Sequence, residues 1–263
     1  MAGSPSIADK LVSGSAACGA RSNSSSVAYC MFSRYGGSSE GRFASLNIAA
    51  NVGDTAAAVA ANRELVKRQA GVTRLVSAHQ THGTSVYCLK TPIDRDVTVG
   101  EKNGCDALVT DVPGTGLMIQ HADCQAILLF DPVTGVIAAV HSGWRGSVQN
   151  IAAKVVGTMT TEFGCDPADI NARISPSLGP CCAEFIHYRE ELPEHFYQFM
   201  TSENYFDFWK ISRSQLTRAG LLNGNIAVCE VCTVCCRDYF SYRRARPNGG
   251  VTGRNCSVIA LVK

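Results

Sequence analysis

The chain has 263 residues, 46% of them hydrophobic, and its 24 basic side chains nearly balance 22 acidic ones, for a net charge of +2. This length suits one large domain rather than two. A charge so close to zero predicts no nucleic-acid partner and no membrane-surface partner. The longest apolar runs are strand-sized and well below the roughly 20 residues of a membrane helix. Residues 1–26, rich in Ser, Ala and Gly and without a signal-peptide pattern, predict a flexible leader before a domain over residues 27–263. We expect a cytoplasmic monomer.

The first half of the domain is predicted to be mostly strands. A strand is expected at Val27–Phe32, followed by a helix over Thr55–Gln69 with Asp54 as its N-cap. Further strands are expected at Arg74–Ala78, Ser85–Leu89, Asp106–Thr110 and Gly116–Gln120. The apolar runs Ala126–Phe130 and Val136–Val140, joined by a turn that contains Pro and Gly, predict a hairpin.

The second half mixes helices and strands. An apolar stripe at helical spacing predicts a helix over Ser147–Phe163, closed by Gly164. Helices are also expected at Arg189–Met200 and Ser212–Ala219, and strands at Asn171–Ser175, Phe240–Arg243 and Ser257–Val262. Because strands and helices do not alternate strictly, we predict a single α+β domain with mixed β-sheets flanked by helices.

Two polar segments, His121–Cys124 and His141–Gly146, flank the predicted hairpin. Cys124 and His141 would then meet at its open end. Two interpretations stay open on these residues alone. They form part of a metal site, or Cys124 is a buried small side chain and His141 a hydrogen-bonded loop residue.

A third polar segment, Ser77–Gly83, follows another predicted strand and holds His79 and His82. Two histidines and a cysteine give three protein ligands, the number found in catalytic zinc sites. The spacing is not that of a zinc finger. A cysteine hydrolase with Cys124 as nucleophile and His141 as base uses the same residues, so metal content has to separate the two.

Several motifs occur together and in a consistent order. They are Ser33–Gly37, Ser45–Asn47, Val52–Asp54, Gln80–Gly83, Ala122–Cys124, His141–Gly146, Ser177–Cys182, Phe240–Arg244 and Thr252–Arg254. From about residue 27 to its end, the chain thereby resembles the laccase-domain (YfiH-like) family, also called the multicopper polyphenol oxidase or purine nucleoside phosphorylase family. One departure is Ser175, which stands where the family often has Gly before Pro-Ser.

The resemblance implies a layered α/β sandwich with zinc on His82, Cys124 and His141. His79 lies in the same loop as His82, but His82 occupies the His-Gly position of the motif. The resemblance also implies an enzyme that phosphorolyses adenosine, inosine, guanosine and methylthioadenosine and deaminates adenosine. Zinc can lower the pKa of a bound water to about 7. Asp123, next to Cys124, is expected to act as a proton shuttle or a hydrogen-bond acceptor.

Phosphorolysis requires a phosphate site. Arg145 directly precedes the helix predicted from Ser147, and a helix N-terminus attracts anions. We expect Arg34, Asn47 and Arg244 to complete the substrate and phosphate site. The basic tail from Arg243 to Arg254 is either an exposed strand face or this anion pocket.

Copper is the alternative metal, with polyphenol oxidation as the alternative activity, since His, Cys and His also form the core of a blue-copper site. Six histidines without a His-x-His pair make a multicopper centre hard to build. A non-enzymatic scaffold or nucleotide-sensing role is the remaining class.

Thirteen cysteines in a chain expected in a reducing compartment predict mostly buried thiols. The run Cys229–Cys236 begins with the C-x2-C-x2-C spacing of an iron–sulfur motif, but the fourth cysteine and the proline are missing. We therefore expect Cys181, Cys182 and most of Cys229–Cys236 to be structural thiols. Iron, sulfide or a second zinc there would contradict this.

Overall fold

Two β-sheets face each other in the computed structural model, which describes residues 27–100 and 102–262. The predicted leader 1–26 lies outside these residues. The five-stranded sheet has the order β1-β13-β6-β2-β4 and the six-stranded sheet the order β12-β9-β7-β8-β5-β3. The strands of the first are β1 (Val27–Phe32), β2 (Arg74–Ala78), β4 (Val97–Val99), β6 (Thr115–His121) and β13 (Asn255–Leu261). Those of the second are β3 (Val86–Leu89), β5 (Ala107–Thr110), β7 (Gln125–Asp131), β8 (Val136–Ser142), β9 (Asn171–Ile174) and β12 (Ile226–Val228).

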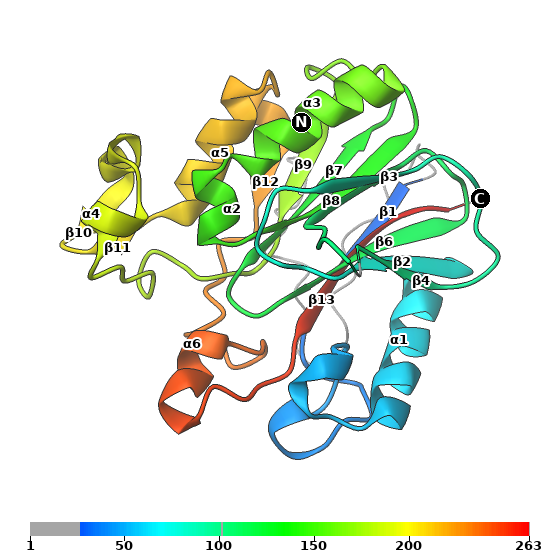
Figure 1. The fold of residues 1–263 in the computed structure, drawn as a ribbon, viewed down its shortest axis with the longest axis horizontal. Helices are drawn as coiled ribbons and strands as arrows, with labels where there is room; N and C mark the ends of the chain where they lie inside the picture. The colour runs from blue at the N-terminus through cyan, green and yellow to red at the C-terminus, as the bar shows by residue number, and fades with distance from the viewer. Residues whose placement is uncertain (1–26, 101, 263) are drawn as a thin grey trace, which may run out of the picture.

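Helices cover the outer faces of both sheets (Figure 1). Helix α1 (Ala56–Ala70) packs on the five-stranded sheet. Helices α3 (Ile151–Phe163) and α5 (Phe208–Arg218) pack on the six-stranded sheet. The remaining elements are α2 (Trp144–Val148), α4 (Tyr188–Glu191), α6 (Tyr242–Ala245), the strand pair β10 (Met200–Ser202) and β11 (Tyr205–Phe206), and short 3₁₀ turns at Gly41–Phe43, Ala50–Val52, Glu194–Phe199, Asn223–Asn225 and Arg246–Asn248. The predicted α+β class and layered sandwich are confirmed.

The central strands read as continuous apolar runs because both of their faces are buried. On β7, Ile127 and Leu129 face the α3 side, whereas Leu128 and Phe130 pack into the layer between the sheets. The hairpin predicted from residues 126–140 is present as β7 and β8, which pair antiparallel with Ala126 opposite His141.

Two helix predictions fail at identifiable residues. The helix expected over Ser147–Phe163 is two helices, because Asn150 adopts a left-handed backbone (φ 55°) and its side chain caps α3 at Ala153 N. The helix expected over Arg189–Met200 is broken at Pro193, which cannot supply the N–H that continued helix requires.

Other boundaries shift because of capping. Thr55, not Asp54, caps α1, while Asp54 accepts hydrogen bonds from Ser39 and Asn47. Helix α5 starts one turn before the predicted Ser212, at the Asp207 cap. The strand expected at Phe240–Arg243 is wrong: Ser241 caps the short helix α6.

Replacement of Leu128 by Ala tests the layer between the sheets. Leu128 is fully buried there, so we expect the free energy of unfolding to fall by about 2–5 kcal/mol through lost burial and the cavity left behind. Urea denaturation measures the change. The control Val133→Ala, at a 73% exposed turn position, should alter stability by less than about 0.5 kcal/mol. A loss below about 1 kcal/mol for Leu128→Ala would contradict this packing.

Candidate metal and active site

Three side chains from separate segments converge at one end of the sandwich. His82 lies in the loop after β2, Cys124 in the turn between β6 and β7, and His141 in β8. Their potential ligand atoms all lie within 4.8 Å of one another. Since β2 and β6 belong to one sheet and β7 and β8 to the other, the site lies where the chain crosses between the sheets.

Asp106 holds two of these residues in place. The carboxylate of Asp106 is fully buried, and its Oδ1 accepts hydrogen bonds from His141 Nδ1 at 2.8 Å and from the backbone N–H of His82 at 2.9 Å. Its Oδ2 accepts from the N–H groups of Thr81 and Gly83. The His82 backbone is left-handed (φ 62°), a conformation that this set of hydrogen bonds stabilises.

Charge coupling sets the protonation of the site. Burial alone would raise the pKa of Cys124, but the charge and hydrogen bonds of His141 and His82 lower it to about 6. Burial alone would lower the pKa of His141, but Cys124 and Asp106 raise it to about 9. Burial opposes ionisation of Asp106 as well, yet His141 and the loop N–H groups lower its pKa to about 2. A thiolate and a deprotonated carboxylate are therefore present at neutral pH.

The donors fit a metal ion. Cysteine sulfur and imidazole nitrogen are ligands that zinc and copper both accept. A carboxylate on the far nitrogen of a ligating histidine is the usual support for such a site. Gly143 adds a steric observation, because a Cβ there would lie 3.0 Å from Cys124 Sγ and 3.1 Å from His82 Cδ2. The chain thus leaves room beside the ligand atoms that any other residue would fill.

The two other histidines near this region are not part of the group. His79 is exposed, and its backbone pairs with Val99 and Cys105. His121 is buried, its Nε2 lies 2.9 Å from Ser257 Oγ, and burial lowers its pKa to about 3, so it is neutral.

Asp123 links three loops around the site. Its Oδ1 accepts from Thr233 Oγ1 at 2.7 Å and its Oδ2 from the backbone N–H of Arg243 at 2.6 Å, while its carbonyl accepts from Leu178 N. Both carboxylate oxygens are engaged by protein donors. This geometry resembles that of a hydrogen-bond acceptor more than that of a proton shuttle.

Arg145 lies at a helix N-terminus, but not that of the long helix expected from Ser147. Helix α2 begins at Trp144 and is five residues long, so Arg145 lies in its first turn and not directly before the helix. Its exposed guanidinium stacks on the Trp144 ring at 4.3 Å. Among the described residues, the basic side chains in ion pairs are Lys67, Lys90, His141 and Lys210, without Arg145.

The other predicted anion-site residues contact the protein itself. Arg34 donates to Ala44 O and stacks over Phe240, and burial together with the charge of Arg244 lowers its pKa. Arg244 donates to backbone carbonyls of the 233–239 loop. The buried amide of Asn47 bonds Ala49, Asp54 and the N–H of Arg254.

Sequence reasoning did not assign a role to Asp106 or Gly143, and it placed Arg254 only in the basic tail. Arg254 lies close enough to Cys124 and Asp123 for their charges to raise its pKa, against a larger lowering by burial. Asp106 carried a signal, because a lone acidic residue directly precedes an apolar strand.

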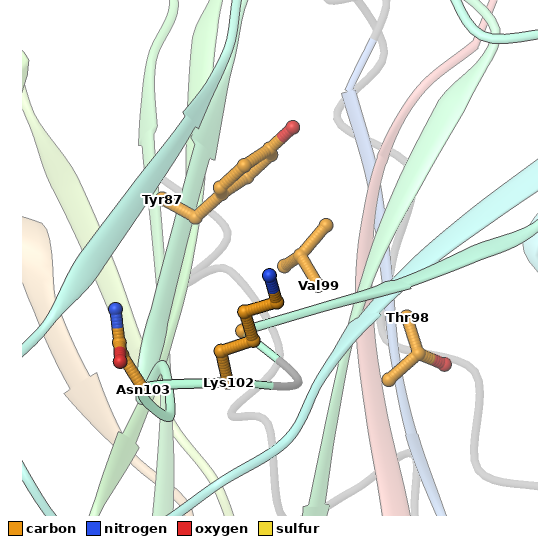
Figure 2. A pocket seen from close by; sticks show the side chains of 6 residues that line it. Tyr87, Thr98, Val99, Lys102 and Asn103 are labelled. Atoms are coloured by element: carbon orange, nitrogen blue, oxygen red, sulfur yellow. The ribbon is translucent and has the colours of Figure 1, made fainter.

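A separate surface pocket of about 390 Å³ lies beside β3 and β4, where the Lys102 side chain points toward Tyr87 and Val99 (Figure 2). None of the residues that line it belongs to the His82–Cys124–His141 group. No helix within residues 27–100 and 102–262 combines the length and apolar character needed to cross a bilayer.

Known proteins match this chain over most of its length. A purine nucleoside phosphorylase of Bacteroides thetaiotaomicron is 32% identical over 92% of this chain and 94% of its own. The adenosine deaminase RL5, from an unknown prokaryotic organism, is 31% identical over 84% and 90%. The crystal structure of Bacillus licheniformis YfiH superposes with a TM-score of 0.80, at 32% identity, over 90% of this chain and 93% of that one. The family model described as multi-copper polyphenol oxidoreductase laccase matches residues 28–262. The chain therefore belongs to this laccase-like family.

Proposed function

We propose that this chain is a zinc-dependent purine nucleoside enzyme. It would phosphorolyse adenosine-, inosine- and guanosine-type nucleosides, methylthioadenosine included, and deaminate adenosine. The observation that carries the proposal is the convergence of His82, Cys124 and His141 around a space that Gly143 keeps open. Relatives named purine nucleoside phosphorylase and adenosine deaminase support the substrate class.

Some residues of the chain would bind the zinc ion, and others position those ligands and the loops around them. When bound at this site, zinc supplies an open coordination position at which water is activated near neutral pH. Asp106 keeps the His141 Nδ1 proton in place, which directs Nε2 toward Cys124 and His82. Asp123 holds the surrounding loops through Thr233 and Arg243. All these residues come from one chain, which is compatible with a monomer.

Phosphate would be bound by guanidinium groups next to the site. Arg145 is exposed, stacked on Trp144, and lies four positions beyond His141 on the same segment. Arg34 and Arg244 lie near enough to repel each other electrostatically, an arrangement that an anion would relieve. Asn47 acts on the site indirectly, through its hydrogen bond to the backbone of Arg254.

A cysteine hydrolase is the second candidate, because Asp106, His141 and Cys124 form a hydrogen-bonded series with a thiolate at its end. That enzyme would work without metal, whereas the proposed one would not. Elemental analysis also separates zinc from copper, the metal of the polyphenol oxidase alternative.

Replacement of Cys124 by Ser tests the metal-dependent reading. We expect the variant to lose the ion bound at this site and both nucleoside activities, because serine oxygen is a poor zinc ligand at neutral pH. Metal content and turnover of inosine and adenosine are measured on the same preparation. The control Cys88→Ser lies on β3 away from the group and should behave as wild type. Full activity of a metal-free wild-type protein would favour the hydrolase.

Replacement of Asp106 by Asn tests the support of His141. The amide has the same shape as the carboxylate, but only its oxygen accepts hydrogen bonds. It therefore cannot accept from both His141 and the three N–H groups of the loop. We expect metal affinity to fall about 10- to 100-fold, measured by competition with a chelator. Asp111→Asn, at an exposed position just past β5, is the control. Unchanged affinity in Asp106→Asn would show that the carboxylate does not support the metal site.

Replacement of Arg145 by Ala separates the two reactions. The rate of phosphorolysis should fall about 10- to 100-fold, because the variant loses a charged guanidinium that can donate two hydrogen bonds to phosphate. Adenosine deamination requires no phosphate and should change much less. Arg189→Ala, which removes a similar arginine stacked on Tyr188, should affect neither. Equal losses in both reactions would mean that Arg145 orders the site generally, and no loss in either would remove it from the site.

A further inference from the structure

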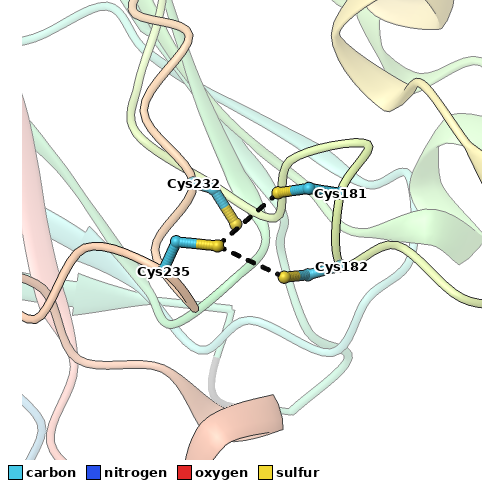
Figure 3. A group of neighbouring side chains, drawn as sticks. All are labelled: Cys181, Cys182, Cys232 and Cys235. Atoms are coloured by element: carbon cyan, nitrogen blue, oxygen red, sulfur yellow. Dashed lines mark hydrogen bonds between the residues drawn. The ribbon is translucent and has the colours of Figure 1, made fainter.

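Four cysteine thiols meet at a second place in the molecule. Cys181 and Cys182 come from the loop after β9, and Cys232 and Cys235 from the loop after β12. All four sulfur atoms lie within 4.8 Å of one another, and Cys235 Sγ is 3.6 Å from Cys181 Sγ and 3.5 Å from Cys182 Sγ. Figure 3 shows the four side chains pointing toward a common centre from two separate loops.

The spacing fits a single tetrahedral ion. Four sulfurs at the usual zinc–sulfur length of about 2.3 Å lie about 3.8 Å from one another. A disulfide would need about 2.05 Å. A cubane iron–sulfur cluster binds each thiolate to a different iron and so holds the sulfurs farther apart. Cys229, the first cysteine of the iron–sulfur-like spacing, is outside the group and contacts Met31.

The two loops are fastened to each other by their backbones. Ser177 pairs with Cys232 in a parallel bridge, with Ser177 N donating to Val231 O and Thr233 N to Ser177 O. Gly179 permits this approach, because a Cβ there would lie 2.8 Å from Cys232 Cβ. The sulfur positions are therefore fixed by the fold, not by one flexible segment.

The surroundings suit a negatively charged metal–thiolate group. Backbone N–H groups of Gly179, Val234 and Cys235 are directed at the Cys232 sulfur. The guanidinium of Arg244 donates to the carbonyls of Val234 at 3.0 Å and Cys236 at 3.4 Å. Four thiolates around a divalent ion carry a net charge of −2, and Arg244 is a cation fastened to the loop that carries Cys232 and Cys235.

We propose that Cys181, Cys182, Cys232 and Cys235 bind one Zn²⁺ as a tetrathiolate site, separate from the His82–Cys124–His141 group. Four Zn–S bonds form, the thiol protons leave to solvent, and no oxidation state changes. With four protein ligands the site has no open position, which is typical of structural zinc. This proposal departs from the expectation that these cysteines are structural thiols without a metal.

The proposed ion also acts on the first site through Asp123. Leu178, in the loop of Cys181 and Cys182, donates to Asp123 O, and Thr233, next to Cys232, donates to Asp123 Oδ1. The two loops that the ion joins are thus the loops that hold the residue preceding Cys124.

Metal analysis of matched variants tests the proposal. Wild type, Cys124→Ser, Cys235→Ser and Cys236→Ser are purified under reducing conditions without added metal, and zinc per chain is measured by mass spectrometry. Cys124→Ser should retain one ion, and the double variant Cys124→Ser/Cys235→Ser should retain none. Cys236→Ser, one residue from the group but outside it, should match wild type. Because Cys124→Ser removes the first site, the result does not depend on the proposed function.

Cobalt binding gives a second readout that needs no substitution among the four cysteines. Metal-free Cys124→Ser protein titrated with Co²⁺ should bind one equivalent, with strong thiolate-to-cobalt charge transfer and the visible bands of tetrahedral cobalt. This titration tests the proposal even if circular dichroism shows that Cys235→Ser is unfolded. No zinc or cobalt on reduced Cys124→Ser protein, iron with acid-labile sulfide, or a disulfide among the four cysteines under reducing conditions would each overturn the proposal.

Discussion

The buried carboxylate of Asp106 joins two parts of the chain that no β-ladder connects directly. It accepts from His141 in β8 and from the backbone of the loop that carries His82. Water does not reach it, so a lost partner would leave an uncompensated buried charge, which costs several kcal/mol. The left-handed turn at His82 and the orientation of the His141 ring are therefore set together. The positions of His82 and His141 relative to each other follow from this one group.

The sandwich places that group at its open end. Strands β2 and β6 of one sheet finish there, and the hairpin of β7 and β8 in the other sheet begins and ends there. Cys124 lies just before β7 and His141 next to the end of β8, two strands whose residues are buried on both faces. The packed apolar layers fix the positions of these strand ends. The side chains of the candidate site, which lie at or next to the strand ends, are fixed with them.

Local sequence patterns predicted the secondary-structure elements that depend on neighbouring residues. The hairpin at residues 126–140 and strand β1 follow from apolar runs and turn residues, and both are confirmed. The break at Asn150 was missed because the apolar stripe continues across it, and only the capping of Ala153 reveals it. Strands β4 and β12 are three residues each and carry too little pattern to be recognised.

The candidate site was predictable only in part, for a similar reason. His82, Cys124 and His141 stood out as polar residues beside apolar strands and through their family motifs. The role of Asp106 depends on hydrogen bonds to two distant segments, which spacing does not encode. The four-cysteine group depends on the pairing of Ser177 with Cys232. Cys229 shares the regular spacing of its neighbours yet lies apart from them.

The distribution of His82, Cys124 and His141 over both sheets has a consequence for folding. An unfolded chain holds these side chains far apart, so a metal ion binds it weakly, whereas the native state presents all three at once. An ion that binds only the native state increases the free energy of unfolding, by mass action. A bound ion would therefore cross-link the two sheets. Its loss would destabilise the contact between the sheets before it destabilised either sheet alone.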